Sequence, residues 1–141
     1  MVDLHNKIAL ITGGARGIGA ATAAVFASKG ATVVICDLPG ADSEQRVQAL
    51  GYEYRPLDVS NEQQWIDTVA SVAQKHGGID VLVNAAGIVG DVVNGALDKM
   101  SFEDWRRVMS VNLDGTFLGC REVMRVMAKA GRGAIVNLAS V

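Results

Sequence analysis

Three glycines, Gly13, Gly17 and Gly19, lie between an apolar run and a small-residue helical pattern in the segment LITGGARGIGAA. A strand that enters a helix through glycines exposes the first helical N–H groups, which lack backbone partners and carry the positive end of the helix dipole. Gly17 and Gly19 would let a pyrophosphate approach these amides, and Gly13 would allow the tight turn. The spacing predicts an anion-binding corner. A tight turn that binds no ligand is the alternative.

Asp37 ends a second apolar run, 18 residues after Gly19. In a βαβ unit, that position puts a carboxylate beside the ribose of a dinucleotide lying on the first helix, where it can accept hydrogen bonds from both ribose hydroxyls. The carboxylate would repel a 2′-phosphate, so NAD is favoured over NADP as the cofactor. Arg16 argues the other way, because a nearby guanidinium could neutralise a 2′-phosphate. A solvated acid at a strand end is the alternative reading of Asp37.

The elements that must position these residues alternate between strands and helices. Short continuous apolar runs predict buried parallel strands, and the amphipathic segments between them predict helices. The predicted strands are Lys7–Thr12, Thr32–Asp37, Tyr52–Asp58, Asp80–Ala85 and Gly133–Ser140, and the predicted helices are Gly17–Lys29, Asp42–Leu50, Ser60–Lys75 and Phe102–Ala130. The expected fold class is α/β, a Rossmann-like doubly wound parallel sheet with strand order 3-2-1-4-5, in a single domain spanning residues 1–141.

Local signals fix some of the expected ends. Ser60 and Gln63 form a capping-box pattern at the start of the third helix, and Ser101 has N-cap character before the fourth. Pro56 suits an edge strand or a strand end. Four apolar residues of the long last helix are expected largely on one side, namely Leu113, Phe117, Met124 and Met127.

Composition and charge exclude several other classes of protein. The chain is 50% apolar and 20% charged with a net charge of −2, which is a globular composition without the basic stripe of a nucleic-acid surface. Cys36 and Cys120 match no metal-ligand spacing and are interpreted as reduced core thiols, so a cytoplasmic protein without a metal site is expected. The N-terminal residues do not resemble a signal peptide, and no apolar run approaches membrane-spanning length.

Five motifs in order resemble the short-chain dehydrogenase/reductase family over the whole chain. They are TGxxxGxG from Thr12 to Gly19, Asp58-Val59 after the third predicted strand, NAAG at 84–87, Asn112 within SVNLDGTF, and Ser140 at the end of GAIVNLAS. The resemblance implies an NAD-dependent oxidoreductase that transfers a hydride between nicotinamide and a secondary alcohol or ketone.

The resemblance also implies a role for each matching residue. Gly13 would form the turn, Arg16, Gly17, Ile18 and Gly19 would line the pyrophosphate, Asp37 would hold the adenosine ribose, Asp58 and Val59 would flank the adenine, and Asn84, Ala85, Ala86 and Gly87 would lie against the cofactor. Asn112 would hold a water of a proton relay, and Ser140 would donate a hydrogen bond to the substrate oxygen. The alternatives are simple packing for the NAAG segment, a solvent-facing polar helix residue for Asn112, and a turn-forming serine for Ser140.

The family's catalytic YxxxK motif does not occur in these 141 residues. The two tyrosines, Tyr52 and Tyr54, are followed four positions later by Pro56 and Asp58. We therefore expect a sequence truncated before that motif, a sheet incomplete on its C-terminal side, and a chain that is inactive alone. A complete chain would form a homodimer or homotetramer. A non-catalytic dinucleotide-binding module, or a domain for another nucleotide-like ligand such as S-adenosylmethionine, remains the alternative.

Overall fold

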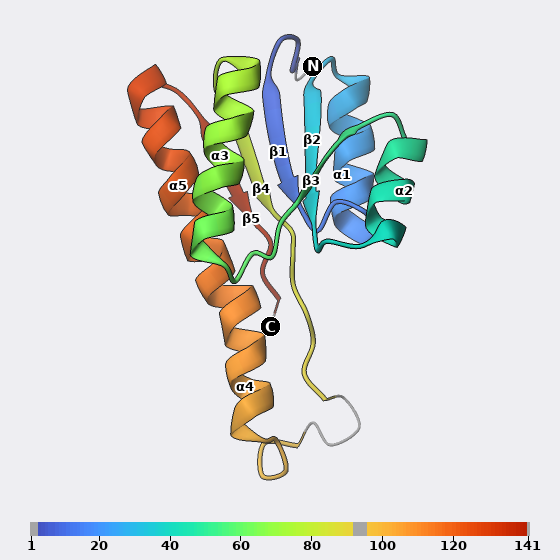
Figure 1. Cartoon of the computed structure of the whole chain (residues 1–141), viewed down its shortest axis with the longest axis vertical. Helices are drawn as coiled ribbons and strands as arrows, with labels where there is room; N and C mark the ends of the chain where they lie inside the picture. Colours follow the sequence, from blue (N-terminus) through green and yellow to red (C-terminus); the bar gives the residue numbers. More distant parts are fainter. Residues whose placement is uncertain (1–2, 92–95, 141) are drawn as a thin grey trace.

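The computed structural model describes residues 3–91 and 96–140 and contains one parallel sheet (Figure 1). Its strand order, β3-β2-β1-β4-β5, confirms the predicted order. The strands are β1 (Ile8–Thr12), β2 (Thr32–Asp37), β3 (Glu53–Pro56), β4 (Val81–Asn84) and β5 (Ala134–Asn137). In the register, Thr12 lies between Cys36 and Asn84, so the carboxyl ends of the three central strands meet at one edge of the sheet.

Helices cover both faces of the sheet, as a doubly wound fold requires. The helices are α1 (Gly17–Ser28), α2 (Ala41–Ala49), α3 (Glu62–His76), α4 (Phe102–Met109) and α5 (Gly115–Ala130). Figure 1 shows α3 and α5 on one face, and α1 and α2 on the other. Consecutive strand residues divide between the two cores, since Leu10 packs with Trp65 and Leu118, whereas Ile11 packs with Ala23.

Close approach of α5 to the sheet depends on Gly119. A Cβ at this position would lie 2.7 Å from Asn84 Oδ1 and 2.7 Å from Trp65 Cη2. One turn earlier, a Cβ at Gly115 would lie 2.8 Å from Val59 Cγ2. Because both glycines face the sheet, the helix backbone can pack directly against the ends of β4 and the segment that follows β3.

The N-terminus of α3 differs from the predicted capping box. Asn61, and not Ser60, is the N-cap, and its side chain accepts a hydrogen bond from the Gln64 amide at 3.0 Å. The prediction was wrong because the Ser60 hydroxyl donates to Asp58 Oδ1 at 2.7 Å and so belongs to the turn after β3. At α4, the Ser101 hydroxyl accepts from the Asp104 amide at 3.0 Å, which confirms the predicted cap.

The predicted long helix is present but contains a π-helical turn, η1 (Ser110–Asp114), between α4 and α5. Leu113, Phe117 and Met124 are each more than half exposed, whereas Met127 is 7% exposed. The expectation that Met127 shares their side was therefore wrong. Met127 follows Val123 by one helical turn, and i, i+4 residues share a face, so it joins the buried stripe.

The carboxylates of Asp80 and Glu53 fix the amino ends of strands, at the edge of the sheet opposite the glycine-rich turn. Asp80 accepts hydrogen bonds from the Ile8 amide at 3.0 Å and from Arg132 Nε at 2.9 Å, which joins the starts of β1, β4 and β5. Burial opposes ionisation of Asp80, but these donors outweigh it and lower the pKa of the carboxyl. The carboxyl ends of the same strands are thereby held in register.

Glu53 fixes the edge strand β3 to the C-terminal turn of α3. Its carboxylate contacts Lys75 Nζ at 2.7 Å and His76 Nε2 at 2.9 Å, and Arg55 lies at 2.7 Å. Burial opposes ionisation of Glu53, but the hydrogen bonds from Lys75, His76 and Arg55 lower its pKa from 4.5 to about 2. Pro56 ends β3 at the sheet's edge, as predicted.

Within residues 3–91 and 96–140, no helix combines the length and apolar character that a membrane crossing needs.

Candidate functional site

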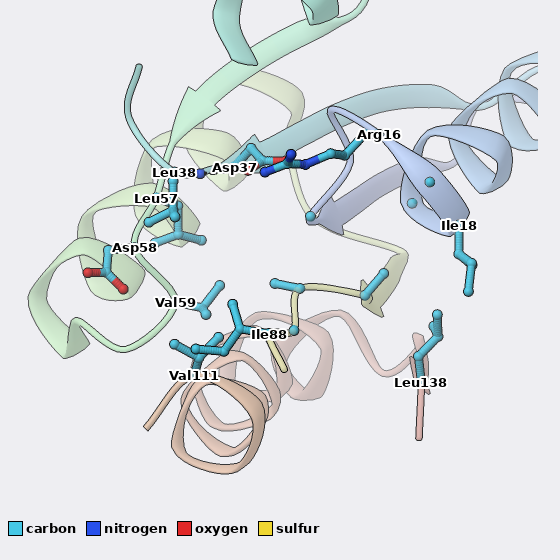
Figure 2. Close-up of a pocket in the computed structure, with 16 residues that line it drawn as sticks. Arg16, Ile18, Asp37, Leu38, Leu57, Asp58, Val59, Ile88, Val111 and Leu138 are labelled. Carbon is cyan, nitrogen blue, oxygen red and sulfur yellow. Dashed lines mark hydrogen bonds between the residues drawn. The ribbon is translucent and has the colours of Figure 1, made fainter. Parts of the chain in front are cut away.

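A cleft of about 370 Å³ opens at the carboxyl ends of the central strands, where ligands bind in doubly wound folds (Figure 2). It collects most of the residues that the sequence assigned to a cofactor. Those that line it are Gly13, Arg16, Gly17, Ile18, Gly19, Asp37, Asp58, Val59, Ala85, Ala86 and Gly87. These residues come from four separate segments of the chain, so the cleft exists only in the folded protein.

The glycine-rich turn forms one side of the cleft. Gly13 and Gly17 have φ values of +63° and +57°, which residues with a Cβ rarely adopt. A Cβ at Gly13 would lie 2.8 Å from Ala86 Cα, and a Cβ at Gly19 would overlap the Gly13 carbonyl oxygen. By contrast, a Cβ at Gly17 would meet no atom within 4 Å, because its open side faces the cleft.

The N-terminus of α1 borders this open space, since Gly17, Ile18 and Gly19 line the cleft. Its N-cap, Arg16, has extended backbone and makes no side-chain capping hydrogen bond, and the first turn contains no acidic residue. The first amides of a helix lack backbone partners and carry partial positive charge. The residues present therefore fit a bound diphosphate, which would receive hydrogen bonds from the start of α1.

Asp37 lies at the end of β2, on the next part of the cleft wall. Its Oδ2 accepts a hydrogen bond from the Ala15 amide at 3.0 Å, and its Oδ1 accepts from the Leu38 amide at 2.9 Å. The Tyr54 hydroxyl donates to the Leu38 carbonyl at 2.9 Å, which fixes the chain after Asp37. The carboxylate lines the cleft, and the backbone amides of Ala15 and Leu38 fix its orientation.

The segment after β3 supplies the opposite, largely apolar wall. The Val59 carbonyl accepts a hydrogen bond from Trp65 Nε1 at 2.9 Å, and the Asp58 amide donates to Gln64 Oε1 at 2.7 Å. Both partners belong to α3, so this helix positions the wall. In Figure 2, Val59 lies close to Ile88 and Val111, and the three side chains form an apolar surface on which a flat ring could pack.

The NAAG segment divides between a buried residue and three that line the cleft. Asn84 is 3% exposed and is absent from the cleft wall. Its Nδ2 donates to Asn137 Oδ1 at 2.9 Å, which links the ends of β4 and β5. Ala85, Ala86 and Gly87 follow it into the cleft. The structure therefore places Asn84 behind the site, where it supports the sheet.

Comparison with known proteins identifies the family. The model for short chain dehydrogenases matches residues 7–141. The chain belongs to the short-chain dehydrogenase family. Members of this family are oxidoreductases that bind nicotinamide dinucleotides.

Individual relatives agree with this membership. The chain is 38% identical over 140 residues to a 3-alpha-(or 20-beta)-hydroxysteroid dehydrogenase of Mycobacterium bovis, covering 98% of this chain and 53% of that protein. It is 42% identical over 143 residues to the 3-oxoacyl-[acyl-carrier-protein] reductase of Thermotoga maritima, covering 98% and 57%. A short-chain type dehydrogenase/reductase from Mycobacterium ulcerans superposes with a TM-score of 0.89 at 28% identity, covering 99% of this chain and 53% of that one. The chain thus spans about half the length of these relatives.

Two further residues that the sequence assigned to short-chain dehydrogenase chemistry lie near the cleft without lining it. Asn112 is in the π-helical turn, where its Oδ1 accepts from the Ile88 amide and its Nδ2 donates to the Ile88 carbonyl, both at 2.9 Å. It therefore clamps the loop after β4 and does not simply face solvent. Ser140 lies in the segment after β5, exposed, beyond Leu138 on the cleft wall.

Thr12 is the most important residue of this short-chain dehydrogenase site that sequence reasoning missed as a site residue. It is 1% exposed, and its Oγ1 accepts hydrogen bonds from the amides of Ala85 and Ala86 at 3.1 Å each. It was visible only as the first letter of the TGxxxGxG motif. A buried threonine at a strand end is ambiguous until the register places β4 beside β1.

Replacing Thr12 by valine should destabilise the protein, because it keeps the shape of the side chain but leaves two backbone amides without their acceptor. An unpaired buried donor costs about 1–3 kcal/mol, so we expect Thr12→Val to lower the free energy of unfolding by about 2 kcal/mol or more. Thr12→Ser, which retains the hydroxyl, should lose less. Urea denaturation measures both, and equal stability of Thr12→Val and the wild type would show that the hydroxyl is dispensable.

Proposed function

We propose that residues 1–141 form a single domain that binds NAD in an oxidoreductase, which transfers a hydride between the nicotinamide and a secondary alcohol or ketone. One observation carries this proposal. The cleft brings the open glycine corner at Gly17 and the carboxylate of Asp37 to the same edge of the sheet, on either side of the Ala15 amide. A diphosphate and its adjoining ribose need such groups side by side.

The preference for NAD follows from the charge beside the ribose. Asp37 would accept hydrogen bonds from the ribose hydroxyls and repel a 2′-phosphate. Leu38, the next residue on the cleft wall, offers no positive charge in compensation. Arg16 also lines the cleft, but the diphosphate would compete for its guanidinium. Asp58 and Val59 would flank the adenine, where the apolar surface that includes Val59 suits a ring.

Binding of the nicotinamide and substrate falls to the other end of the cleft. Leu138 lines the cleft away from the Val59 surface in Figure 2, Ser140 follows it two residues later, and Asn112 holds the Ile88 backbone from the helix behind. We assign to Asn112 the holding of a water in a proton relay and to Ser140 a hydrogen bond to the substrate oxygen. When bound, NAD would supply the hydride acceptor, and these residues would orient the alcohol or carbonyl group.

The substrate class is proposed from the chemistry that the relatives' names share. One relative is named for a hydroxysteroid and another for a 3-oxoacyl group, which are a hydroxyl and a keto substrate of very different shape. A secondary alcohol or its ketone is common to both.

The proton-transferring tyrosine of this chemistry has no counterpart among the 141 residues. Tyr52 and Tyr54 are the two tyrosines of the chain, and the Tyr54 hydroxyl is hydrogen bonded to Leu38 at the adenosine end of the cleft. We therefore propose that this chain alone binds the cofactor without turnover. The same observation favours the second candidate, a dinucleotide-binding module without catalysis.

We also propose that the protein self-associates through the outer side of α5. Phe117 and Met124 are exposed there, Leu113 is exposed in the preceding η1 turn, and Arg121 lies over the Phe117 ring at 5.4 Å. Arg121 is held in turn by Glu62 and Glu122, so these apolar side chains have an ordered polar border. An exposed apolar patch with a polar rim is typical of an interface between protein chains.

A reducing, cytoplasmic compartment is part of the proposal. Cys36 and Cys120 are both free thiols, and Cys36 is fully buried. Burial raises the pKa of the Cys36 thiol, which keeps it protonated and unreactive. Free thiols of this kind are usual in cytosolic proteins.

Nucleotide binding is the direct test of the cofactor assignment. In calorimetry, the wild type should bind NAD⁺ more tightly than NADP⁺, and Asp37→Ala should reduce this preference by about tenfold, because the repulsive charge is removed. Glu103→Ala, which removes a negative charge from the first turn of α4, should leave the ratio unchanged. Absence of heat with both nucleotides would contradict the proposed function.

Turnover by the 141-residue chain should be negligible. When NAD⁺ and a panel of secondary alcohols are added, NADH absorbance should rise no faster than in the protein-free control, because no tyrosine is available to take the hydroxyl proton. An active short-chain dehydrogenase assayed in parallel provides the positive control. Sustained NADH formation would show that another group transfers the proton.

Self-association should depend on Phe117. Sedimentation velocity should detect dimers or larger species of the wild type, and Phe117→Glu should weaken the association by about tenfold or more, because it places a charge in an apolar contact. Leu50→Glu, at an exposed leucine after α2, serves as the matched control and should not change the distribution. A wild type that is monomeric at all concentrations would reject this interface.

A further inference from the structure

We infer that Asp37 is a positioning residue for the diphosphate-binding turn, in addition to its proposed contact with the ribose. The inference rests on the proposed function of the cleft. Its carboxylate joins β2 to the glycine-rich turn, so it shapes a second part of the site that it need not touch. Asp37 therefore couples the sugar subsite to the phosphate subsite.

The tether is the hydrogen bond from the Ala15 amide to Asp37 Oδ2 at 3.0 Å. Ala15 is 7% exposed, so water could not readily replace this acceptor. A second contact between the same segments, from the Gly14 amide to the Cys36 carbonyl, is longer at 3.4 Å. The carboxylate consequently provides the shorter of the two links between β2 and the turn, and it is the link with a charged acceptor.

The position of Ala15 determines where the first amides of α1 point. Ala15 lies between two glycines of positive φ, Gly13 and Gly17, which alone leave the backbone many accessible conformations. Arg16, the N-cap, follows Ala15 directly and has no side-chain capping bond. Fixing the Ala15 amide therefore removes the freedom that would otherwise let the N-terminus of α1 turn away from the cleft.

The two roles of Asp37 are compatible, because a carboxylate has about four acceptor sites. One site on Oδ2 is taken by Ala15 and one on Oδ1 by Leu38, which leaves one site on each oxygen for the ribose hydroxyls. An asparagine could not do the same, since its Nδ2 would face one of these amides as a second donor. Only an acid can therefore hold both amides and still offer an acceptor site on each oxygen to the sugar.

A ligand without ribose hydroxyls separates the two roles. We compare the binding of ADP and of 2′,3′-dideoxyadenosine 5′-diphosphate to the wild type and to Asp37→Ala by calorimetry. If Asp37 acts only through the hydroxyls, Asp37→Ala should bind the dideoxy compound at least as tightly as the wild type, because a negative charge near the diphosphate is removed. If it also positions the turn, Asp37→Ala should bind the dideoxy compound about tenfold more weakly, which matches the loss of one hydrogen bond to a charged group.

Charge removal needs its own control, because deleting an acid near a diphosphate favours binding. Glu44→Ala removes a negative charge from the first turn of α2, near Tyr54, but Glu44 accepts from Gln48 and neither lines the cleft nor contacts the glycine-rich turn. We expect Glu44→Ala to bind the dideoxy compound at least as well as the wild type. Equal weakening by both substitutions would overturn the inference.

Hydrogen exchange tests the tether without any ligand. The Ala15 amide should lose protection by about tenfold or more in Asp37→Ala, with no comparable loss in Glu44→Ala. If Asp37→Ala does not fold, Asp37→Ser, which removes the carboxylate and keeps a small polar side chain, carries both measurements. Unchanged exchange at Ala15 would reject the positioning role and leave the proposed function intact. Failure of the wild type to bind ADP or NAD⁺ would reject the proposed function. The exchange result would still show whether Asp37 holds the Ala15 amide in place.

Discussion

The cleft depends on one close contact between the first and fourth strands of the sheet. The Thr12 hydroxyl oxygen accepts hydrogen bonds from the amides of Ala85 and Ala86. One residue later, Gly13 packs so closely against Ala86 that a Cβ would not fit. A hydroxyl and a missing Cβ therefore set the distance between the two loops that leave β1 and β4. Because strand order reverses at this point, the loops diverge to opposite faces and leave the space in which the cleft forms.

Other contacts protect this geometry from both sides of the sheet. Asp80 holds the amino ends of β1, β4 and β5, so the register that brings Thr12 opposite Asn84 cannot slip. On the helical side, Gly119 lets α5 rest against Asn84, whose amide in turn links to Asn137. If a strand shifted by one residue, each of its side chains would move to the opposite face of the sheet. These contacts at the ends of the sheet therefore decide which groups face the cleft.

Sequence reasoning predicted the architecture because the signals for it are local and repeated. Continuous apolar runs gave five parallel strands in the observed order, and Thr32–Asp37 matched its strand at both ends. The errors arose where neighbours compete for one hydrogen bond or one face. Ser60 could have capped α3, but Asp58 accepts its hydroxyl, and Met127 could have joined Met124, but the spacing from Val123 buries it. Such outcomes depend on tertiary contacts that no single segment contains.

Asn84 shows why a motif cannot by itself separate ligand-binding residues from those that build the site. It stands beside Ala85 in the sequence, yet Asn84 is the last residue of β4 and is buried against β5 and α5, whereas Ala85 and Ala86 leave the strand and line the cleft. Asp37 presents the opposite case, since one carboxylate both lines the cleft and holds the turn. Under the proposed function, backbone amides would bind the diphosphate, and side chains such as those of Thr12 and Asp37 would chiefly fix where those amides point.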